Sequence, residues 1–266
     1  MSAVSAAFAK AAAEDRAALV GYLPAGYPSV EGAIEAILAM AEAGADVIEL
    51  GLPYSDPLID GPVIQEAVHE ALLRGTTVAD VLRTVRAVAG AGVPTLVMTY
   101  WNPVDHHGVG AFARELAEAG GSGLITPDLT PEEAGQWLAA AAEYDLDPVF
   151  LIAPSSTNER IELITSQCSG FVYAASRMGI TGTREAVSSD AAELVQRARK
   201  YTRLPIGVGL GVRDGRQAAE VASFADGVIV GSAFVQRLLA ADSPQEGIAG
   251  VRELASELAA GVRGGR

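Results

Sequence analysis

This sequence of 266 residues has few of the side chains on which many enzyme mechanisms depend. Its single cysteine, Cys168, excludes an intramolecular disulfide framework and is consistent with a reducing compartment. It has three histidines, and none lies with a second ligand residue at the end of a predicted strand, so we expect no metal site. Only two of the 19 basic residues are lysines, and neither follows a predicted strand, which argues against a Schiff-base lysine.

Positive charge and long apolar runs are also scarce. The net charge of −14 argues against binding to nucleic acids and to anionic membranes, because both need a basic face. No run reaches the roughly 18 apolar residues that span a bilayer. Residues 1–19 lack the apolar core of a secretory signal. We therefore expect a cytoplasmic protein that contacts neither nucleic acid nor membrane.

The sequence does contain a regular alternation of two kinds of segment. Short apolar runs predict eight buried parallel strands, at 18–23, 46–52, 94–100, 122–127, 147–153, 170–175, 205–210 and 226–231. Segments of helical period lie between and after them, at 31–43, 63–73, 78–90, 109–119, 131–143, 157–166, 189–200, 214–223 and 245–262. Such a pattern is typical of α/β proteins with a parallel sheet.

The alternation fits either an open doubly wound sheet or a closed barrel. Eight units in about 250 residues favour the barrel. We therefore predict a single (β/α)₈ TIM barrel that forms one domain over residues 1–266, with an extra N-terminal helix at 3–15. Additional short helices are expected after the second and eighth strands. In such a barrel, the functional residues lie at the carboxyl ends of the strands.

Glu49 lies in the second predicted strand, where a carboxylate is unusual. Strand alternation places it on the same face as Gly51, which we interpret as the barrel interior. A structural role would pair this carboxylate with a buried Arg or Lys, but none of the eight predicted strands contains a basic residue. Burial without a partner raises the pKa of a carboxyl group and suits it to general acid–base catalysis near neutral pH. We therefore predict that Glu49 is catalytic.

Two further carboxylates, Asp56 and Asp60, follow the second strand in a loop rich in proline and glycine. An aspartate in such a place often serves only a turn or a helix N-terminus, and a helix is predicted directly after Asp60. From the residues alone, a capping role and a chemical role for Asp60 both stay open.

Glycines gather in the loops after the sixth, seventh and eighth predicted strands. They occur at Gly179 and Gly182, in Gly-Val-Gly-Leu-Gly at 207–211, and at Gly231 before Ser232. Barrels often bind phosphate between the last two of these loops, at the N-terminus of a short helix, because glycines let backbone N–H groups approach the anion. Tight turns explain one such cluster, but neighbouring clusters predict a phosphorylated substrate.

A buried carboxylate beside a phosphate site suits isomerisation, aldol cleavage or ring closure. Aldol cleavage normally uses a lysine or a metal, and we expect neither here. It would then require a substrate that accepts the electrons itself, as an indole does when its C3 atom is protonated. A sugar-phosphate isomerase also stays open, although the sequence has Tyr22 and Tyr173 where such an enzyme needs a base or a lysine.

Seven segments spread over nearly the whole chain make it resemble the alpha subunit of tryptophan synthase. They are PAGYPS (24–29), AGADVIELGLPYSDPLIDGPVIQ (43–65), MTYWNPV (98–104), GLITPDLTPEE (123–133), FVYAASRMGITGTR (171–184), GVGLGV (207–212) and ADGVIVGSA (225–233). The resemblance implies a (β/α)₈ barrel that cleaves indole-3-glycerol phosphate to indole and D-glyceraldehyde 3-phosphate, a carbon–carbon lyase reaction of tryptophan biosynthesis. It implies no cofactor in this chain. The implied partner is a β subunit that carries pyridoxal phosphate and receives the indole within an α₂β₂ complex.

The same resemblance implies roles for individual residues. Glu49 would protonate indole C3 and help to deprotonate the glycerol hydroxyl, and Asp60 would accept the indole N–H and stabilise the cationic intermediate. The other implied residues are Tyr22, Met98, Ile152, Tyr173 and Thr181 for substrate binding, Gly182, Gly211, Gly231 and Ser232 for phosphate binding, and Pro53, Asp56 and Asn102 for the partner interface.

The sequence departs from the family pattern at four positions. Ile59 stands where a small alanine is common, Met178 replaces a small residue, and Tyr22 and Tyr54 stand where phenylalanine is common. These changes leave both carboxylates in place and bear on how the loop after the second strand packs. A non-catalytic subunit that only activates its partner therefore stays an alternative.

Overall fold

Parallel strands form the centre of the molecule. The computed structural model describes residues 1–175 and 184–265, without the side chains of 184–188. Its strands are β1 (Ala18–Pro24), β2 (Val47–Gly51), β3 (Thr95–Met98), β4 (Gly123–Ile125), β5 (Asp147–Val149), β6 (Leu151–Ile152), β7 (Val172–Ala175), β8 (Ile206–Gly209) and β9 (Gly227–Val230). The order in the sheet is β5-β4-β3-β2-β1-β9-β8-β7-β6. The fifth predicted strand is thus divided at Phe150, and its two halves are the two ends of the sheet, which closes the barrel.

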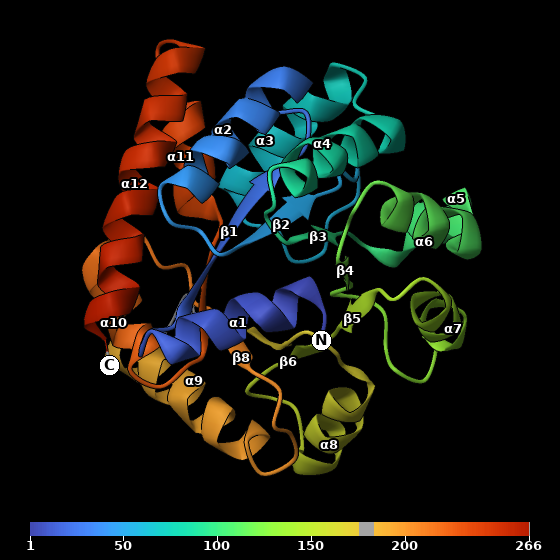
Figure 1. Ribbon diagram of the computed structural model, residues 1–266, viewed down its shortest axis with the longest axis vertical. Helices are drawn as coiled ribbons and strands as arrows, with labels where there is room; N and C mark the ends of the chain where they lie inside the picture. The colour runs from blue at the N-terminus through green and yellow to red at the C-terminus, as the bar shows by residue number, and fades with distance from the viewer. Residues whose placement is uncertain (176–183, 266) are drawn as a thin grey trace.

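Helices surround these strands on the outside (Figure 1). They are α1 (Ala3–Ala13), α2 (Val30–Glu42), α3 (Pro62–Leu73), α4 (Val78–Gly90), α5 (Trp101–His107), α6 (Val109–Glu118), α7 (Gly135–Glu143), α8 (Asn158–Gln167), α9 (Arg184–Ala198), α10 (Gly215–Ala222), α11 (Ser232–Leu239) and α12 (Pro244–Gly264). The predicted TIM barrel is confirmed, with its N-terminal helix α1 and the additional helices α3 and α11. The sequence pattern does not predict α5, which occupies the expected loop after β3.

Two apolar layers hold the barrel together. Between the sheet and the helices lies a large outer layer that includes Ile48 and Leu50 of β2. Inside the barrel lies a smaller cluster that includes Val47 of β2 and Leu96 of β3. The alternation along β2 therefore points Val47, Glu49 and Gly51 inward, as the sequence predicts.

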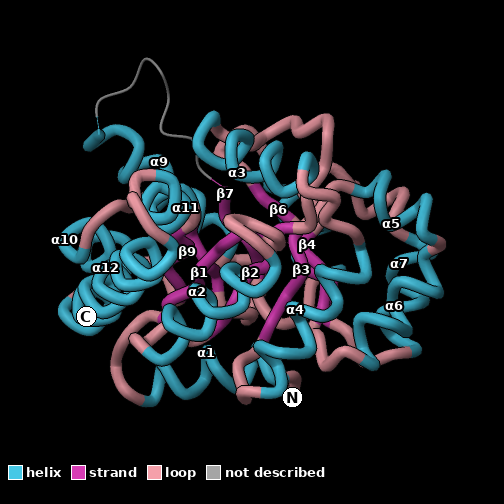
Figure 2. Tube along the Cα trace, turned by 90° about the horizontal axis from the view of Figure 1, so that it is seen from above, coloured by secondary structure: helices cyan, strands magenta, loops and turns pink. Residues whose placement is uncertain are grey.

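The amino end of the barrel is closed by α1. Phe8 of this helix stacks on Phe171, with ring centroids 5.3 Å apart. Figure 2 shows the strands from the side, with α1 at one end of them and α3 at the other. Among the described residues, α1 thus covers the amino end of the barrel, and α3 and α11 begin at the carboxyl ends of the strands.

Candidate active site

Glu49 lies near the carboxyl end of β2, inside the barrel. Its neighbours across the sheet are Tyr22 on β1 and Leu96 on β3. Its side chain is 1% exposed, and its Oε2 atom has no hydrogen-bond partner among the described residues. Buried polar atoms are nearly always paired in folded proteins, so an unpaired carboxyl oxygen calls for a functional explanation.

The surroundings of Glu49 disfavour its charge. Burial raises the pKa of this carboxyl group to about 8, and the negative charge of Asp60 contributes a smaller part of the rise. The buried Arg16 cannot compensate, because it lies before β1 and its Nη1 atom contacts Asp46 Oδ2 at 2.7 Å, at the opposite end of β2. No cation of the described residues lowers the pKa of Glu49. The group therefore keeps its proton at neutral pH.

Asp60 lies beside Glu49 in the same pocket. Its side chain is half-buried, and desolvation raises the pKa of its carboxyl group, while a hydrogen bond with the Tyr100 hydroxyl opposes the rise. The Tyr100 hydroxyl also accepts the backbone N–H groups of Leu58 and Ile59, each at 3.0 Å. Tyr100 therefore holds in place the loop that carries Asp60.

The alternative role of Asp60 as a helix cap is not observed. The N-cap of α3 is Gly61, and no side chain caps this helix. The helix begins instead with Pro62. Proline has no backbone N–H group, so this position of the first turn needs no capping partner. The Asp60 carboxylate is therefore free to face the pocket.

This pocket brings together most of the predicted site residues in a cavity of about 190 Å³. The predicted residues in its lining are Tyr22, Glu49, Asp60, Met98, Tyr173, Gly211, Gly231 and Ser232. Ile59, Gly61, Ile64, Gly209 and Ile229 complete the lining. Two carboxylates thus share an otherwise largely apolar and aromatic space, which strengthens the electrostatic interactions within it.

Tyr22 and Tyr173 fit into the pocket because glycines stand opposite them. A Cβ atom on Gly51 would lie 2.4 Å from the Tyr22 hydroxyl oxygen, and one on Gly209 would lie 2.8 Å from that of Tyr173. Burial raises the pKa of both tyrosines well above the ordinary value. Both hydroxyls therefore stay protonated, and neither is suited to act as a base near neutral pH.

Ile152 does not line this pocket. It is fully buried, pairs with Ala174 across β6 and β7, and packs in the outer layer between sheet and helices. Its neighbour Leu151 pairs with Tyr173, and both contact the inner cluster. Ile152, which the resemblance implies for substrate binding, therefore points away from the pocket, because successive side chains of a strand point to opposite faces. Alternation from the inward Val149 identifies Leu151 as the next inward position.

Gly211, Gly231 and Ser232 lie together at one side of the pocket. Gly211 has a φ of +69°, a left-handed conformation that glycine adopts without strain. Gly231 is the N-cap of α11, and no side chain caps this helix. The first N–H groups of α11 therefore lack intrahelical partners, and together with the helix dipole they favour an anion. The arrangement suits a phosphate group.

Three residues of interest lie outside the described residues. They are Thr181 and Gly182, predicted to contact substrate and phosphate, and Met178, one of the departures from the family pattern.

The residues predicted to face a partner lie around the loop after β2. Asp56 is exposed, whereas Pro53 is buried and lines a separate cavity beside α5 with Pro103, His106 and His107. Asn102 is exposed at the start of α5, where its Nδ2 atom donates to the Tyr54 hydroxyl at 3.0 Å. This contact joins the loop after β2 to the loop after β3, so that both contribute to one surface.

The described residues offer neither a metal-binding cluster nor a membrane-spanning helix. No group of three or more His, Cys, Asp or Glu side chains in this part of the chain is placed to hold a metal ion. No helix among the same residues is long and apolar enough to cross a membrane.

Comparison with known proteins points to one family. The family profile described as "Tryptophan synthase alpha chain" matches residues 8–263. A tryptophan synthase alpha chain from Salinispora tropica is 58% identical over 263 residues, which are 99% of this chain and 98% of that one. Another, from Thermobifida fusca, is 58% identical over 258 residues, 96% of each chain.

Solved structures agree with the sequence comparison. A chain in a crystal structure of tryptophan synthase from M. tuberculosis has a TM-score of 0.91 and 52% identity, with 99% of each chain covered. The tryptophan synthase subunit alpha from Legionella pneumophila has a TM-score of 0.90 and 31% identity, with 98% of each chain covered. With its barrel, its paired carboxylates and this similarity over nearly the full length, the chain belongs to the tryptophan synthase alpha chain family, the carbon–carbon lyases of tryptophan biosynthesis.

Proposed function

We propose that Glu49 and Asp60 carry out the alpha reaction of this family, the cleavage of indole-3-glycerol phosphate to indole and D-glyceraldehyde 3-phosphate. The observation that carries the proposal is the buried Glu49 carboxyl group, whose pKa is raised to about 8 beside a second carboxylate in the pocket. A carboxylic acid that keeps its proton at pH 7 can donate that proton to carbon.

The proposed reaction balances without a cofactor in this chain. Glu49 donates its proton to indole C3, and the resulting positive charge spreads to N1, whose N–H is bound by the Asp60 carboxylate. The bond between indole C3 and the glycerol chain then breaks, and its electron pair restores the aromatic ring. The neighbouring glycerol hydroxyl loses its proton to Glu49 and becomes the aldehyde oxygen. Glu49 ends the cycle in the protonated form in which it began.

The remaining pocket residues would orient the substrate. Tyr22, Met98 and Leu151 flank the inner part of the pocket, where the indole ring would lie, and Tyr173 would pack beside the glycerol chain. The phosphate would lie against Gly182, Gly211, Gly231 and Ser232, whereas Thr181 would help to bind the rest of the substrate. The uncapped N-terminus of α11 supports this placement.

We further propose a β subunit as partner, in an α₂β₂ complex with pyridoxal phosphate held by the β subunit. Support comes from the surface formed by the loops after β2 and β3, where Asp56 and Asn102 are exposed. Leu58 on the same loop is 72% exposed, which is unusual for a large apolar side chain. The cytoplasm is the proposed location, in keeping with a free cysteine.

The experiment that tests this function measures indole released from indole-3-glycerol phosphate by the isolated chain, with and without a β subunit. Steady release by the isolated chain, accelerated by the β subunit, is the expected result. An absence of release under both conditions would contradict it. Release only in the presence of the β subunit, unaffected by loss of Glu49, would instead identify the chain as a non-catalytic activator.

A sugar-phosphate isomerase is disfavoured by the same geometry. Such an enzyme needs a base or a lysine near the ends of the sixth or first predicted strands, where this chain has Tyr173 and Tyr22. Burial raises the pKa of both tyrosines, so their ionised forms are rare near neutral pH. Incubation with triose and pentose phosphates is therefore expected to leave these sugars unchanged.

A further inference from the structure

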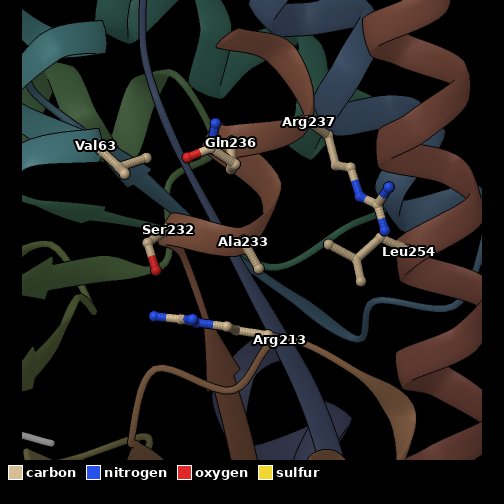
Figure 3. A pocket seen from close by; sticks show the side chains of 7 residues that line it. All are labelled: Val63, Arg213, Ser232, Ala233, Gln236, Arg237 and Leu254. Atoms are coloured by element: carbon tan, nitrogen blue, oxygen red, sulfur yellow. The ribbon is translucent and has the colours of Figure 1, made fainter. Parts of the chain in front are cut away.

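A second cavity, of about 340 Å³, adjoins the pocket at Ser232. It is lined by Val63, Arg213, Ser232, Ala233, Gln236, Arg237 and Leu254 (Figure 3). Ser232 lines both cavities, so they meet at the N-terminus of α11. The second cavity therefore reaches the proposed phosphate position from the outer side.

Arg213 is the basic residue nearest in sequence to the proposed phosphate loop, two positions after Gly211. Its side chain runs extended beneath α11 in Figure 3, and its guanidinium group ends on the side of the Ser232 hydroxyl. The residue is exposed, and none of the ion pairs formed by the described residues involves it. Its charge is therefore available to an anion that binds in front of Ser232.

The backbone that carries Arg213 is held firmly. The Arg213 N–H donates to Gln217 Oε1 at 2.9 Å. Asp214, the carboxylate next to it in sequence, caps α10 by accepting the Gln217 N–H at 2.8 Å and the Gln217 Nε2–H at 2.9 Å. Val212 on the other side is buried. These contacts fix the backbone from which the Arg213 side chain extends. They also occupy the Asp214 carboxylate with Gln217, so that it does not pair with Arg213.

The part of the pocket that the structure describes has no positive charge to match a phosphate ester. Among the described residues, its lining contains the carboxyl groups of Glu49 and Asp60 and no basic side chain. A phosphate monoester carries roughly −1.5 to −2 charges at neutral pH, and backbone N–H groups supply only partial positive charge. A guanidinium group can form two parallel hydrogen bonds to phosphate oxygens.

We propose that Arg213 binds the phosphate group of the substrate from the outer side of Ser232 and thereby sets the preference for a phosphorylated substrate. This proposal rests on the phosphate position described under the proposed function. In this proposal Arg213 is a binding residue: it contacts the phosphate and takes no part in proton transfer. Loss of the side chain should therefore weaken binding and leave the chemical step intact.

The kinetic test compares Arg213→Ala and Arg213→Lys with the matched control Arg237→Ala. Arg237 lines the same cavity, but its guanidinium group points toward Leu254 of α12 in Figure 3. Arg213→Ala is expected to raise the KM for indole-3-glycerol phosphate about tenfold with little change in kcat, because a charge-assisted hydrogen bond is lost. Arg213→Lys should lie between Arg213→Ala and the unchanged protein, and Arg237→Ala should match the unchanged protein.

Indole-3-glycerol without the phosphate separates this role from a structural one. On that substrate, Arg213→Ala and the unchanged protein should have the same kcat/KM. An equal loss on both substrates, or a KM no higher than that of Arg237→Ala, would overturn the proposal.

A binding measurement does not depend on turnover. It therefore tests the role of Arg213 separately from the proposed cleavage reaction. Glycerol 3-phosphate is titrated into each variant and followed by NMR, and Arg213→Ala should bind it about tenfold more weakly than Arg237→Ala does. Equal binding by the two variants contradicts the role of Arg213, even if the unchanged protein cleaves its substrate. Binding that depends on Arg213 in a protein without cleavage activity would instead contradict only the proposed function.

Discussion

Glu49→Gln protein is expected to release indole from indole-3-glycerol phosphate at least about 10³-fold more slowly than the unchanged protein. Glutamine has nearly the same shape but no proton to donate to carbon. The pocket, as far as it is described, holds one other carboxyl group, Asp60, whose proposed role requires its ionised form. Steady-state indole release with saturating substrate measures the effect. A variant with near-normal turnover would rule out the proposed mechanism.

Binding and stability serve as controls for Glu49→Gln. Glycerol 3-phosphate should bind the variant within a few-fold of its affinity for the unchanged protein, since the phosphate position is separate from Glu49. Stability should respond to pH in a defined direction. The folded-state pKa of Glu49, about 8, lies above the ordinary value of 4.5, so the folded protein binds a proton that the unfolded chain has lost between these pH values.

Glu49 therefore contributes stability that is fully present below pH 4.5 and is lost as the pH rises through 8. Glutamine does not titrate. The free energy of unfolding of Glu49→Gln, relative to the unchanged protein, should thus increase by several kcal/mol across this window. Urea denaturation at a series of pH values measures the difference.

Asp60→Asn is expected to lower kcat by about 10²–10³-fold with a small change in KM. Asparagine still offers a carbonyl oxygen to the indole N–H, so binding persists. It carries no negative charge, so the cationic intermediate loses its main electrostatic stabilisation. The separate measurement of kcat and KM distinguishes this effect from a loss of substrate affinity.

Glu66→Gln is the matched control for Asp60→Asn. Glu66 is an exposed carboxylate on the first turns of α3, close in sequence to the same loop. Its substitution removes the same formal charge and should leave both kcat and KM unchanged. Equal effects of the two substitutions would mean that the charge of the whole region matters, and the specific role of Asp60 would be abandoned.

Local periodicity predicts much of this fold and the inward position of Glu49, the residue proposed to be catalytic. Alternation along β2, together with Gly51, places Glu49 inside the barrel, and the inner cluster confirms that placement through Val47. The absence of basic residues from the predicted strands predicts that Glu49 has no cationic partner, and none of the described residues provides one. The same alternation, followed from Val149, points Leu151 inward and Ile152 outward, which contradicts the substrate contact that the resemblance implies for Ile152.

Contacts between distant segments could not be predicted in the same way. The α5 helix begins at Trp101, whose N–H donates to Asp128 Oδ1 at 2.9 Å, from a loop 27 residues later. Tyr100 likewise accepts two N–H groups from a loop about 40 residues earlier. Neither partner carries a local sequence signal. Arg213 is visible beside a glycine cluster, but only the fold brings it against Ser232.

Glu49 is expected to be a protonated acid at neutral pH. Carbon-13 NMR of protein labelled at the glutamate carboxyl carbons tests it directly, with the Glu49 resonance identified by its absence from Glu49→Gln. The structure predicts a titration midpoint of about 8 for this resonance. A midpoint near the ordinary value of 4.5 would contradict the account, because the group would then be ionised at pH 7 and could not supply the proton.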